Sequence, residues 1–334
     1  MPSLLTISSL IVSFIVTLLI TPYWIKRAKT HGLVGQDMHK PGSKIAELGG
    51  LAVICGFLAG LLYYIAIDVF VYGNASYSKY ILAGICSVLI ATIIGLTDDI
   101  LGWKIGLRQY QKVILTAAIV FPMMVINSGH SVITIPFLGR YDIGLLYPLI
   151  LLPIGIIGAS NAFNMIAGYN GLEAGLGIII LSTLGYLSWA NHMGWVAVMA
   201  FCMVAALLAF LIFNMYPASV FPGDTMTYSV GTLIAIIAIL GNIEKFALVL
   251  FIPYFIELAL KARGRMQKES FAKVMSEGTL AKPYKQYYGI EHIAIDLAAK
   301  IKGRAYEYDV VLAIWGFELF LAAIILLNMR YFVF

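Results

Sequence analysis

Charged residues are scarce in this sequence: Asp, Glu, Lys and Arg make up 12% of its 334 residues, against about 25% in a soluble globular domain. Apolar residues account for 61%, and they recur in runs of about 20, the length that a helix needs to cross a bilayer. The composition excludes a water-soluble fold, a coiled coil and a disordered chain. It predicts an all-α polytopic membrane protein that forms a single integral-membrane domain over residues 1–334.

Cysteines are few, and the common nucleotide-binding and protease motifs are missing. Cys55, Cys86 and Cys202 all lie inside apolar runs, where we interpret them as small buried hydrophobes and not as a disulfide framework or a zinc site. The sequence has no P-loop, no GxGxxG after a strand and no HExxH. These absences argue against ATP-driven transport and proteolysis, and nothing here predicts a nucleic-acid partner.

Ten apolar runs predict ten membrane-spanning helices. Their approximate bounds are 4–24, 48–70, 79–97, 110–127, 143–161, 172–189, 194–213, 227–241, 245–260 and 307–329. Between the fourth and fifth runs, residues 131–140 are rich in β-branched side chains, and this short segment predicts a small hairpin.

The basic residues predict the orientation of these helices. The loops after the odd-numbered runs, together with the adjoining Lys112, hold 18 of the 22 Lys and Arg residues. Because basic residues near span ends stay on the cytoplasmic side, both termini are expected outside and five loops in the cytoplasm. These loops are residues 25–47, 98–109, 161–171, 214–226 and 261–306, and the last is long enough to include an amphipathic helix on the membrane surface.

Three of these cytoplasmic segments carry polar side chains that a membrane protein seldom places at a span end. Asp98 and Asp99 end the third run, and two adjacent carboxylates are costly there unless a cation or a proton is shared between them. Asn161, Asn164 and Asn170 lie in a glycine-rich segment after the fifth run. Amides can ligate a hard cation or hydrogen-bond a nucleobase.

Asp224 follows a Pro-Gly turn at the start of the eighth run, so it faces the cytoplasm with the other acidic and amide groups. Such a sparse oxygen-ligand set suits Mg²⁺, which keeps water and phosphate oxygens in its remaining positions, with Mn²⁺ as an alternative. On the same side, Lys112, Arg263 and Arg265 are candidates to neutralise a diphosphate. The residues favour phosphoryl transfer at the membrane surface.

At this point the motifs resemble those of the polyprenyl-phosphate N-acetylhexosamine-1-phosphate transferase family. They are Lys40-Pro41, Glu47-Leu48-Gly49-Gly50, Asp98-Asp99, NAFNMIAGYNGLEAG at 161–175 and FPGDTMTYSVG at 221–231. The resemblance covers nearly the whole chain, and it implies ten spans with a cytoplasmic site. Ala167-Gly168 and Met226 are similar to the eukaryotic and archaeal branch that transfers GlcNAc 1-phosphate from UDP-GlcNAc to dolichyl phosphate. That reaction, which releases UMP, begins lipid-linked oligosaccharide synthesis for N-glycosylation.

The resemblance also implies roles for single residues. Asn164 and Asp224 would bind Mg²⁺, while Asp98 and Asp99 would organise or deprotonate the lipid phosphate. Substrate binding falls to six residues, of which Asn170 and Phe221 would hold the uracil; the others are Lys112, Asn161, Arg263 and Arg265. Gly264 stands where the family usually has a histidine among basic residues, and His292 is no obvious replacement.

Two other functions remain open from the residues. A family member with another donor, such as a different UDP-hexosamine or UDP-MurNAc-pentapeptide, would carry the same motifs. A secondary transporter would instead use Glu257 and Glu318, which lie inside apolar runs, as proton-relay groups. The resemblance further implies a homodimer surrounded by membrane lipid, in either an archaeal plasma membrane or the endoplasmic reticulum.

Overall fold

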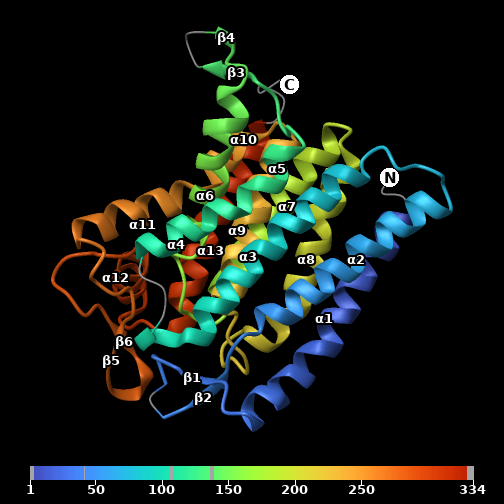
Figure 1. Ribbon diagram of the computed structural model, residues 1–334. Coiled ribbons are helices and arrows are strands. Elements are labelled where there is room, and N and C mark those ends of the chain that lie inside the picture. The colour runs from blue at the N-terminus through green and yellow to red at the C-terminus, as the bar shows by residue number, and fades with distance from the viewer. Residues whose placement is uncertain (1–3, 41, 106–108, 136–138, 329–334) are drawn as a thin grey trace.

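The computed structural model describes residues 4–40, 42–105, 109–135 and 139–328, and within them the chain is predominantly helical (Figure 1). Pro41 of the first motif and residues 106–108 of the second cytoplasmic loop lie outside the described residues. The prediction of an all-α membrane protein is confirmed at this level, with short hairpins as its only strands within the described ranges.

Seven of the described helices are long and apolar enough to cross a membrane. They are α1 (Leu4–Thr30), α2 (Gly50–Phe70), α3 (Ser78–Ile105, apolar to Leu101), α7 (Leu172–Ala190), α8 (Gly194–Asn214), α9 (Gly223–Leu240) and α13 (Glu307–Asn328). Each coincides with one of the predicted apolar runs.

The other three apolar runs form shorter helical pieces. They are α4 (Gln109–Thr116), η1 (Ala117–Val120) and α5 (Phe121–Val125); η2 (Tyr147–Leu151) and α6 (Leu152–Phe163); and α10 (Glu244–Leu250) and α11 (Ile252–Arg263). Pro122, Pro148, Pro153 and Pro253 lie in the first turn of a piece. Proline lacks an N–H and is tolerated there, so these runs bend or divide where a proline falls.

Three antiparallel hairpins lie at the ends of the bundle. β1 (Val34–Gln36) pairs with β2 (Lys44–Ala46), β3 (Val132–Ile135) with β4 (Gly139–Asp142), and β5 (Lys273–Val274) with β6 (Leu280–Ala281). The β3–β4 pair confirms the hairpin predicted for residues 131–140. The first and third hairpins lie at the opposite end of the bundle from β3–β4, with α12 (Ile290–Lys302) beside the third (Figure 1).

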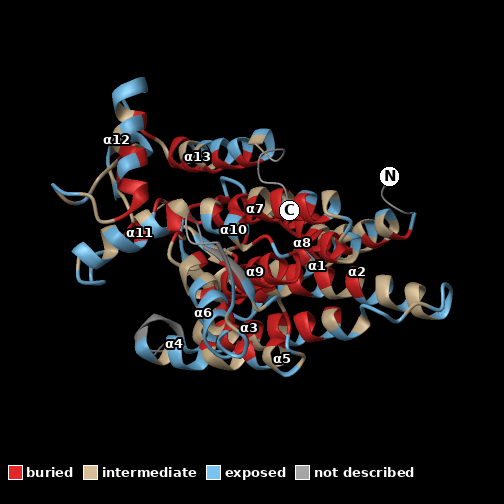
Figure 2. Cartoon of the chain, turned by 90° about the horizontal axis from the view of Figure 1, so that it is seen from above, coloured by how far each residue is buried: buried red, intermediate tan, exposed pale blue. Residues whose placement is uncertain are grey.

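Helix α9 lies at the centre of the bundle (Figure 2). In its most apolar window 89% of the residues are buried within the protein, against 28% for α1 and 39% for α13. It packs against α3 and α6, and Gly231 of α9 leaves room for Ala159 and Ser160 of α6. The amino end of α9 is therefore fixed by neighbouring helices.

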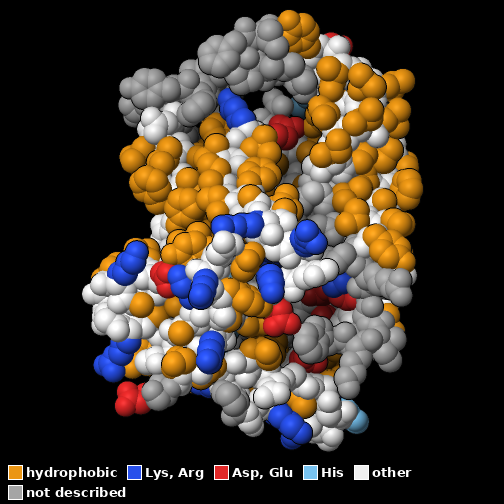
Figure 3. Space-filling model, turned by 90° about the vertical axis from the view of Figure 1, so that its left-hand side faces the viewer, with side chains coloured by type: hydrophobic (Ala, Val, Ile, Leu, Met, Phe, Trp, Pro, Cys, Tyr) orange, Lys and Arg blue, Asp and Glu red, His pale blue; other side chains and the backbone are white. Residues whose placement is uncertain are grey.

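Small residues let α1 and α2 approach closely. Gly56 and Gly60 of α2 lie against Thr17 and Ser13 of α1, where a Cβ atom on either glycine would clash. Such small-residue contacts are typical of helix pairs within a membrane. Figure 3 shows a broad band of apolar side chains on one face, with Lys and Arg side chains below it, which matches a bundle surrounded by lipid.

Candidate active site

A cluster of two carboxylates around one lysine joins three elements at one end of the bundle. Asp98 lies near the end of α3, Lys112 on α4 and Asp224 in the first turn of α9. The Lys112 Nζ pairs with Asp98 and lies 3.1 Å from Asp224 Oδ2. The side chains of all three are less than a quarter exposed. The cluster therefore places two carboxyl groups against one ammonium group in a partly buried position.

Asp99 has a different environment from its neighbour Asp98. Its carboxylate accepts hydrogen bonds from the backbone N–H of Asp224 at 2.8 Å and from the N–H and hydroxyl of Thr225 at 2.9 and 2.7 Å. These N–H groups belong to the first turn of α9, where no intrahelical partner exists. Asp99 therefore caps α9 from another helix.

Two glycines make this contact between α3 and α9 possible. Gly223 has a φ of +70° and lies against the Asp99 carboxylate, while Gly95 lies against the backbone of Asp224. A Cβ on either would meet these atoms, and the left-handed φ of Gly223 favours glycine in any case. The turn Pro222-Gly223 thus places the Asp224 side chain beside Lys112.

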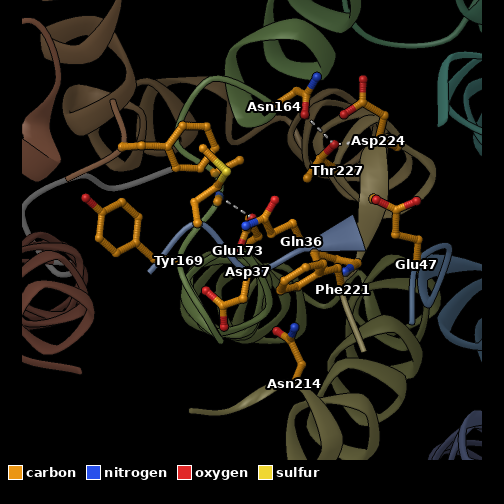
Figure 4. Close-up of a pocket in the computed structure, with 16 residues that line it drawn as sticks. Gln36, Asp37, Glu47, Asn164, Tyr169, Glu173, Asn214, Phe221, Asp224 and Thr227 are labelled. Carbon is orange, nitrogen blue, oxygen red and sulfur yellow. Dashed lines mark hydrogen bonds between the residues drawn. The ribbon is translucent and has the colours of Figure 1, made fainter. Parts of the chain in front are cut away.

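A pocket of about 250 Å³ opens next to this cluster (Figure 4). It is lined by side chains from the β1 segment, the asparagine-rich segment, the start of α9 and the long C-terminal loop. The lining residues are Gln36, Asp37, Met38, Glu47, Asn164, Ala167, Gly168, Tyr169, Glu173, Asn214, Phe221, Pro222, Gly223, Asp224, Thr227 and Phe271. Segments far apart in the sequence therefore form one concave site.

The pocket has the oxygen ligands that a hard cation needs. Asn164 and Asp224 both line it, and the Asn164 Oδ1 accepts a hydrogen bond from the Thr227 hydroxyl at 2.8 Å. Carboxylate and amide oxygens with open positions suit Mg²⁺. The ammonium of Lys112 contacts Asp98 and Asp224, so these two carboxylates already have one cation between them.

The oxygens of Asn164 and Asp224 fit the predicted Mg²⁺.

The sequence was compared with protein families and with known proteins, and the matches cover the segments that form the pocket. The model of glycosyl transferase family 4 matches residues 81–242. A Saccharolobus solfataricus protein provisionally named UDP-N-acetylglucosamine–dolichyl-phosphate N-acetylglucosaminephosphotransferase is 37% identical over 319 residues, which is 94% of each chain. A Sulfolobus acidocaldarius protein with the same provisional name is 33% identical over 320 residues, 94% of this chain and 93% of the relative. The chain belongs to glycosyl transferase family 4.

The chain is also similar to a bacterial protein whose name gives a different sugar donor. The phospho-N-acetylmuramoyl-pentapeptide-transferase of Halalkalibacterium halodurans is 30% identical over 280 residues, 77% of this chain and 84% of the relative. The part of the chain that matches family 4 runs from α3 to just beyond α9, so it contains Asp98, Asp99, Lys112, Asn164 and Asp224. The polar cluster thus lies within the family region.

Of the six predicted substrate-binding residues, Phe221 lines the pocket, Lys112 contacts the pocket-lining Asp224, and the other four lie away from the lining. The Asn161 amide donates to Thr116 Oγ1 and to the Ile157 carbonyl, and Asn170 is buried, with its amide donating to Asp37 Oδ2. Arg263 and Arg265 are exposed at the end of α11. The predictions for these four therefore gain no support from their positions, whereas Phe221, Asn164 and Asp224 line the pocket.

Several residues at the site were not predicted. Lys261, just before the two arginines, donates to the Met165 carbonyl at 2.7 Å and so reaches the asparagine-rich segment. Gln36 and Asp37 line the pocket, as does Glu47, whose pKa is raised by burial and by the charge of Asp99. The polar run Gln36-Asp37 ahead of the second span was the available sequence signal, because it lies in a predicted cytoplasmic loop.

Proposed function

We propose that this protein transfers GlcNAc 1-phosphate from UDP-GlcNAc to a polyprenyl phosphate of the dolichyl type, giving polyprenyl-diphosphate-GlcNAc and UMP. The observation that carries the proposal is the cluster of Asp98, Lys112 and Asp224 at the edge of a pocket that also presents Asn164 and Phe221. The names of the two archaeal relatives support the same donor and acceptor. In an archaeon the membrane concerned is the plasma membrane.

The reaction is a single displacement. An oxygen of the polyprenyl phosphate attacks the β-phosphorus of UDP-GlcNAc, the bond from that phosphorus to the bridging oxygen breaks, and UMP leaves. Since a phosphate monoester has its second pKa at about 6, the acceptor is already mostly ionised at neutral pH. The protein therefore has to position the two phosphates and neutralise their charge, which is how phosphoryl transfer is usually accelerated.

Each member of the cluster has a part in that task. Lys112, held between two carboxylates, is placed to meet a phosphate oxygen when a substrate enters. Asp98 lies beside Lys112 and organises the acceptor phosphate. Asp99 is a positioning residue, because its oxygens are bonded to the first turn of α9 and thereby hold Asp224 in place.

Asn164 and Asp224 would hold Mg²⁺, whose contribution when bound is to neutralise charge on the diphosphate and on the departing UMP. Phe221 would stack on the uracil. Asn170 supports that site from behind, because its amide is bonded to the pocket-lining Asp37 at 3.3 Å. Arg263 and Arg265, at the exposed end of α11, would guide the anionic donor toward the pocket.

We further propose ten spans, with both termini outside and the site in the cytoplasm. Seven come from the long helices, and the remaining three are built from the divided helices α4 to α5, η2 to α6 and α10 to α11. The distribution of Lys and Arg supports this orientation, because 18 of the 22 fall in or beside the loops predicted to be cytoplasmic.

A second candidate donor is UDP-MurNAc-pentapeptide, and the 30% identity to the Halalkalibacterium halodurans transferase favours it. Ala167-Gly168 argues the other way, since the resemblance places an Asp-Gly pair there in the pentapeptide branch. Both residues line the pocket. Donor competition separates the two candidates.

The test is release of UMP by the purified protein given UDP-GlcNAc, Mg²⁺ and dolichyl phosphate. UMP should form only when lipid and metal are both present, and Asp224→Asn should abolish it. Asp296→Asn is the matched control, because Asp296 of α12 pairs with Lys282 and neither residue lines the pocket. Absence of UMP with every UDP-sugar would contradict the proposal and return attention to a transporter.

A further inference from the structure

A second group of buried polar residues adjoins the pocket, and one of them, Asp37, lines it. Asp37 and His39 follow β1, and Glu307 begins α13; the three are 3%, 5% and 3% exposed. One possible ligand atom from each lies within 4.8 Å of the other two. In the described ranges no lysine or arginine forms an ion pair with either carboxylate. His39 is therefore the one basic side chain beside these two buried acids in that part of the chain.

Hydrogen bonds fix these side chains without using all their atoms. Asp37 accepts from the His39 N–H at 2.9 Å and from the Asn170 amide, while Glu307 Oε1 accepts from the Asn170 N–H at 2.7 Å. Among the described residues, Glu307 Oε2 has no hydrogen-bond partner. Buried polar atoms are rarely left so, and an ion is one of the explanations.

The spacing of the histidine and the glutamate points the same way. His39 Nδ1 lies 3.5 Å from Glu307 Oε1, which is beyond the usual length of an N–H···O hydrogen bond. Two ligands that are each about 2.0–2.1 Å from one zinc ion at the tetrahedral angle lie about 3.3 Å apart. The pair is therefore spaced as two ligands of one ion are.

We propose that Asp37, His39 and Glu307 bind a divalent transition-metal ion, with Zn²⁺ preferred, at a site separate from the predicted Mg²⁺ site. One imidazole nitrogen with two carboxylates is a ligand set that zinc accepts, and magnesium prefers oxygen alone. The two negative charges match the charge of the ion. The proposal does not rest on the proposed function.

The consequence of the ion is mechanical. It ties the segment after β1 to the start of α13, and through Asn170 to the segment that carries Asn164. The His39 ring also packs against the Tyr169 ring, tilted by 36° with 4.3 Å between the ring centroids, and Tyr169 lines the pocket. Asp37, Tyr169 and Gly168 of the pocket wall are thus held from behind by one centre.

The experiment measures metal content directly. The full chain is purified in detergent through an affinity tag without histidine, incubated with Zn²⁺, and passed through gel filtration in excess Mg²⁺ before elemental analysis. About one Zn²⁺ per chain is expected for the wild type, and a loss of at least about tenfold for His39→Asn. His292→Asn is the matched control, because His292 is also buried with an unpartnered Nε2 among the described residues; it should keep its zinc.

A second variant guards against misfolding. Glu307→Gln keeps the side-chain shape while removing the charge, and it should also lose zinc while eluting as the wild type does. Asp224→Asn should keep zinc yet release no UMP, which separates this proposal from the proposed function. Wild-type protein without zinc, or His39→Asn with a full equivalent, would overturn the proposal and leave a simple histidine–glutamate contact.

Discussion

Two polar clusters lie on either side of the pocket, and they solve the same electrostatic problem differently. Asp98 and Asp224 hold Lys112 between them, whereas Asp37 and Glu307 have only His39. Burying two carboxylates without a cation is costly. In the first cluster the cation is the Lys112 side chain, and in the second it would be the proposed metal ion, bound from solution.

This difference separates chemistry from support. The side chain of Lys112 on α4 is flexible, so its ammonium group can leave a carboxylate and bind a substrate phosphate instead. An ion held by three buried ligands cannot leave without uncovering them. The first cluster is therefore suited to meeting substrates, and the second to holding the wall.

The largest expected effect comes from removing the cation of the first cluster. Lys112→Gln should lower the rate of UMP release by about 10²–10³-fold, the usual loss when one stabilising donor is removed from an active site. Lys112→Arg, which keeps the charge, should lose less. Steady-state assays at saturating lipid measure both, and a change within twofold for Lys112→Gln would mean that the lysine is only structural.

The second largest effect is expected when a chelator removes the proposed metal ion from the second cluster. EDTA in excess Mg²⁺ should lower the apparent melting temperature of zinc-loaded protein by several degrees, since an ion present at about 1,000 times its Kd stabilises by about 4 kcal/mol. Glu307→Gln should melt at the same temperature with and without the chelator. Equal shifts in both proteins would point to an ion bound elsewhere.

Asp99→Asn tests the cap that holds the first cluster in place. Replacing one acceptor oxygen by an amide group removes at least one bond to the first turn of α9, at a cost of about 1–2 kcal/mol, as for other helix caps. The apparent melting temperature should fall by a few degrees, and activity by less than in Lys112→Gln. An unchanged melting temperature together with complete inactivity would instead assign Asp99 to the chemistry.

The smallest effect is expected at Lys282 and Asp296, a partly exposed ion pair that belongs to neither cluster. The hydrogen bond from Lys282 lowers the pKa of Asp296. A lowered pKa contributes stability above the ordinary value of about 3.9, and this contribution is lost as the pH falls through the folded value. Because a partly exposed ion pair contributes little, Asp296→Asn should lower the melting temperature at pH 7 only slightly and leave activity intact. A large loss at pH 7 would show that α12 influences the site.

Much of the first cluster could be predicted from the sequence. The basic loops and the apolar runs put Asp98, Lys112 and Asp224 on one side of the bundle, and the structure brings them into contact. The separate positions of Asp98 and Asp99 could not be predicted. Successive residues on a helix point about 100° apart, so only the packing of α9 decides which one becomes the cap.

The second cluster and the pocket wall were harder to foresee. Asn170 lies between Gly168 and Gly171, whose φ values of +101° and +87° reverse the chain. The direction of the Asn170 side chain depends on these turns, which the sequence allows but does not specify. Glu307 lies 270 residues from Asp37 along the chain, and only the folded bundle brings them together. The division of three apolar runs into shorter helices was also not predicted, because hydropathy averages over their prolines.

The buried position of α9 has a consequence for how such a protein can change its donor. Asp224 and Thr227 belong to the most enclosed helix of the bundle, whereas Gln36, Asp37 and Phe271 reach the same pocket from segments outside the spanning helices. Substitutions at Gln36 or Phe271 would alter the shape of the pocket while leaving the packing of α9 unchanged. The pocket is thus built half from a helix that its neighbours enclose and half from segments that few helices hold in place.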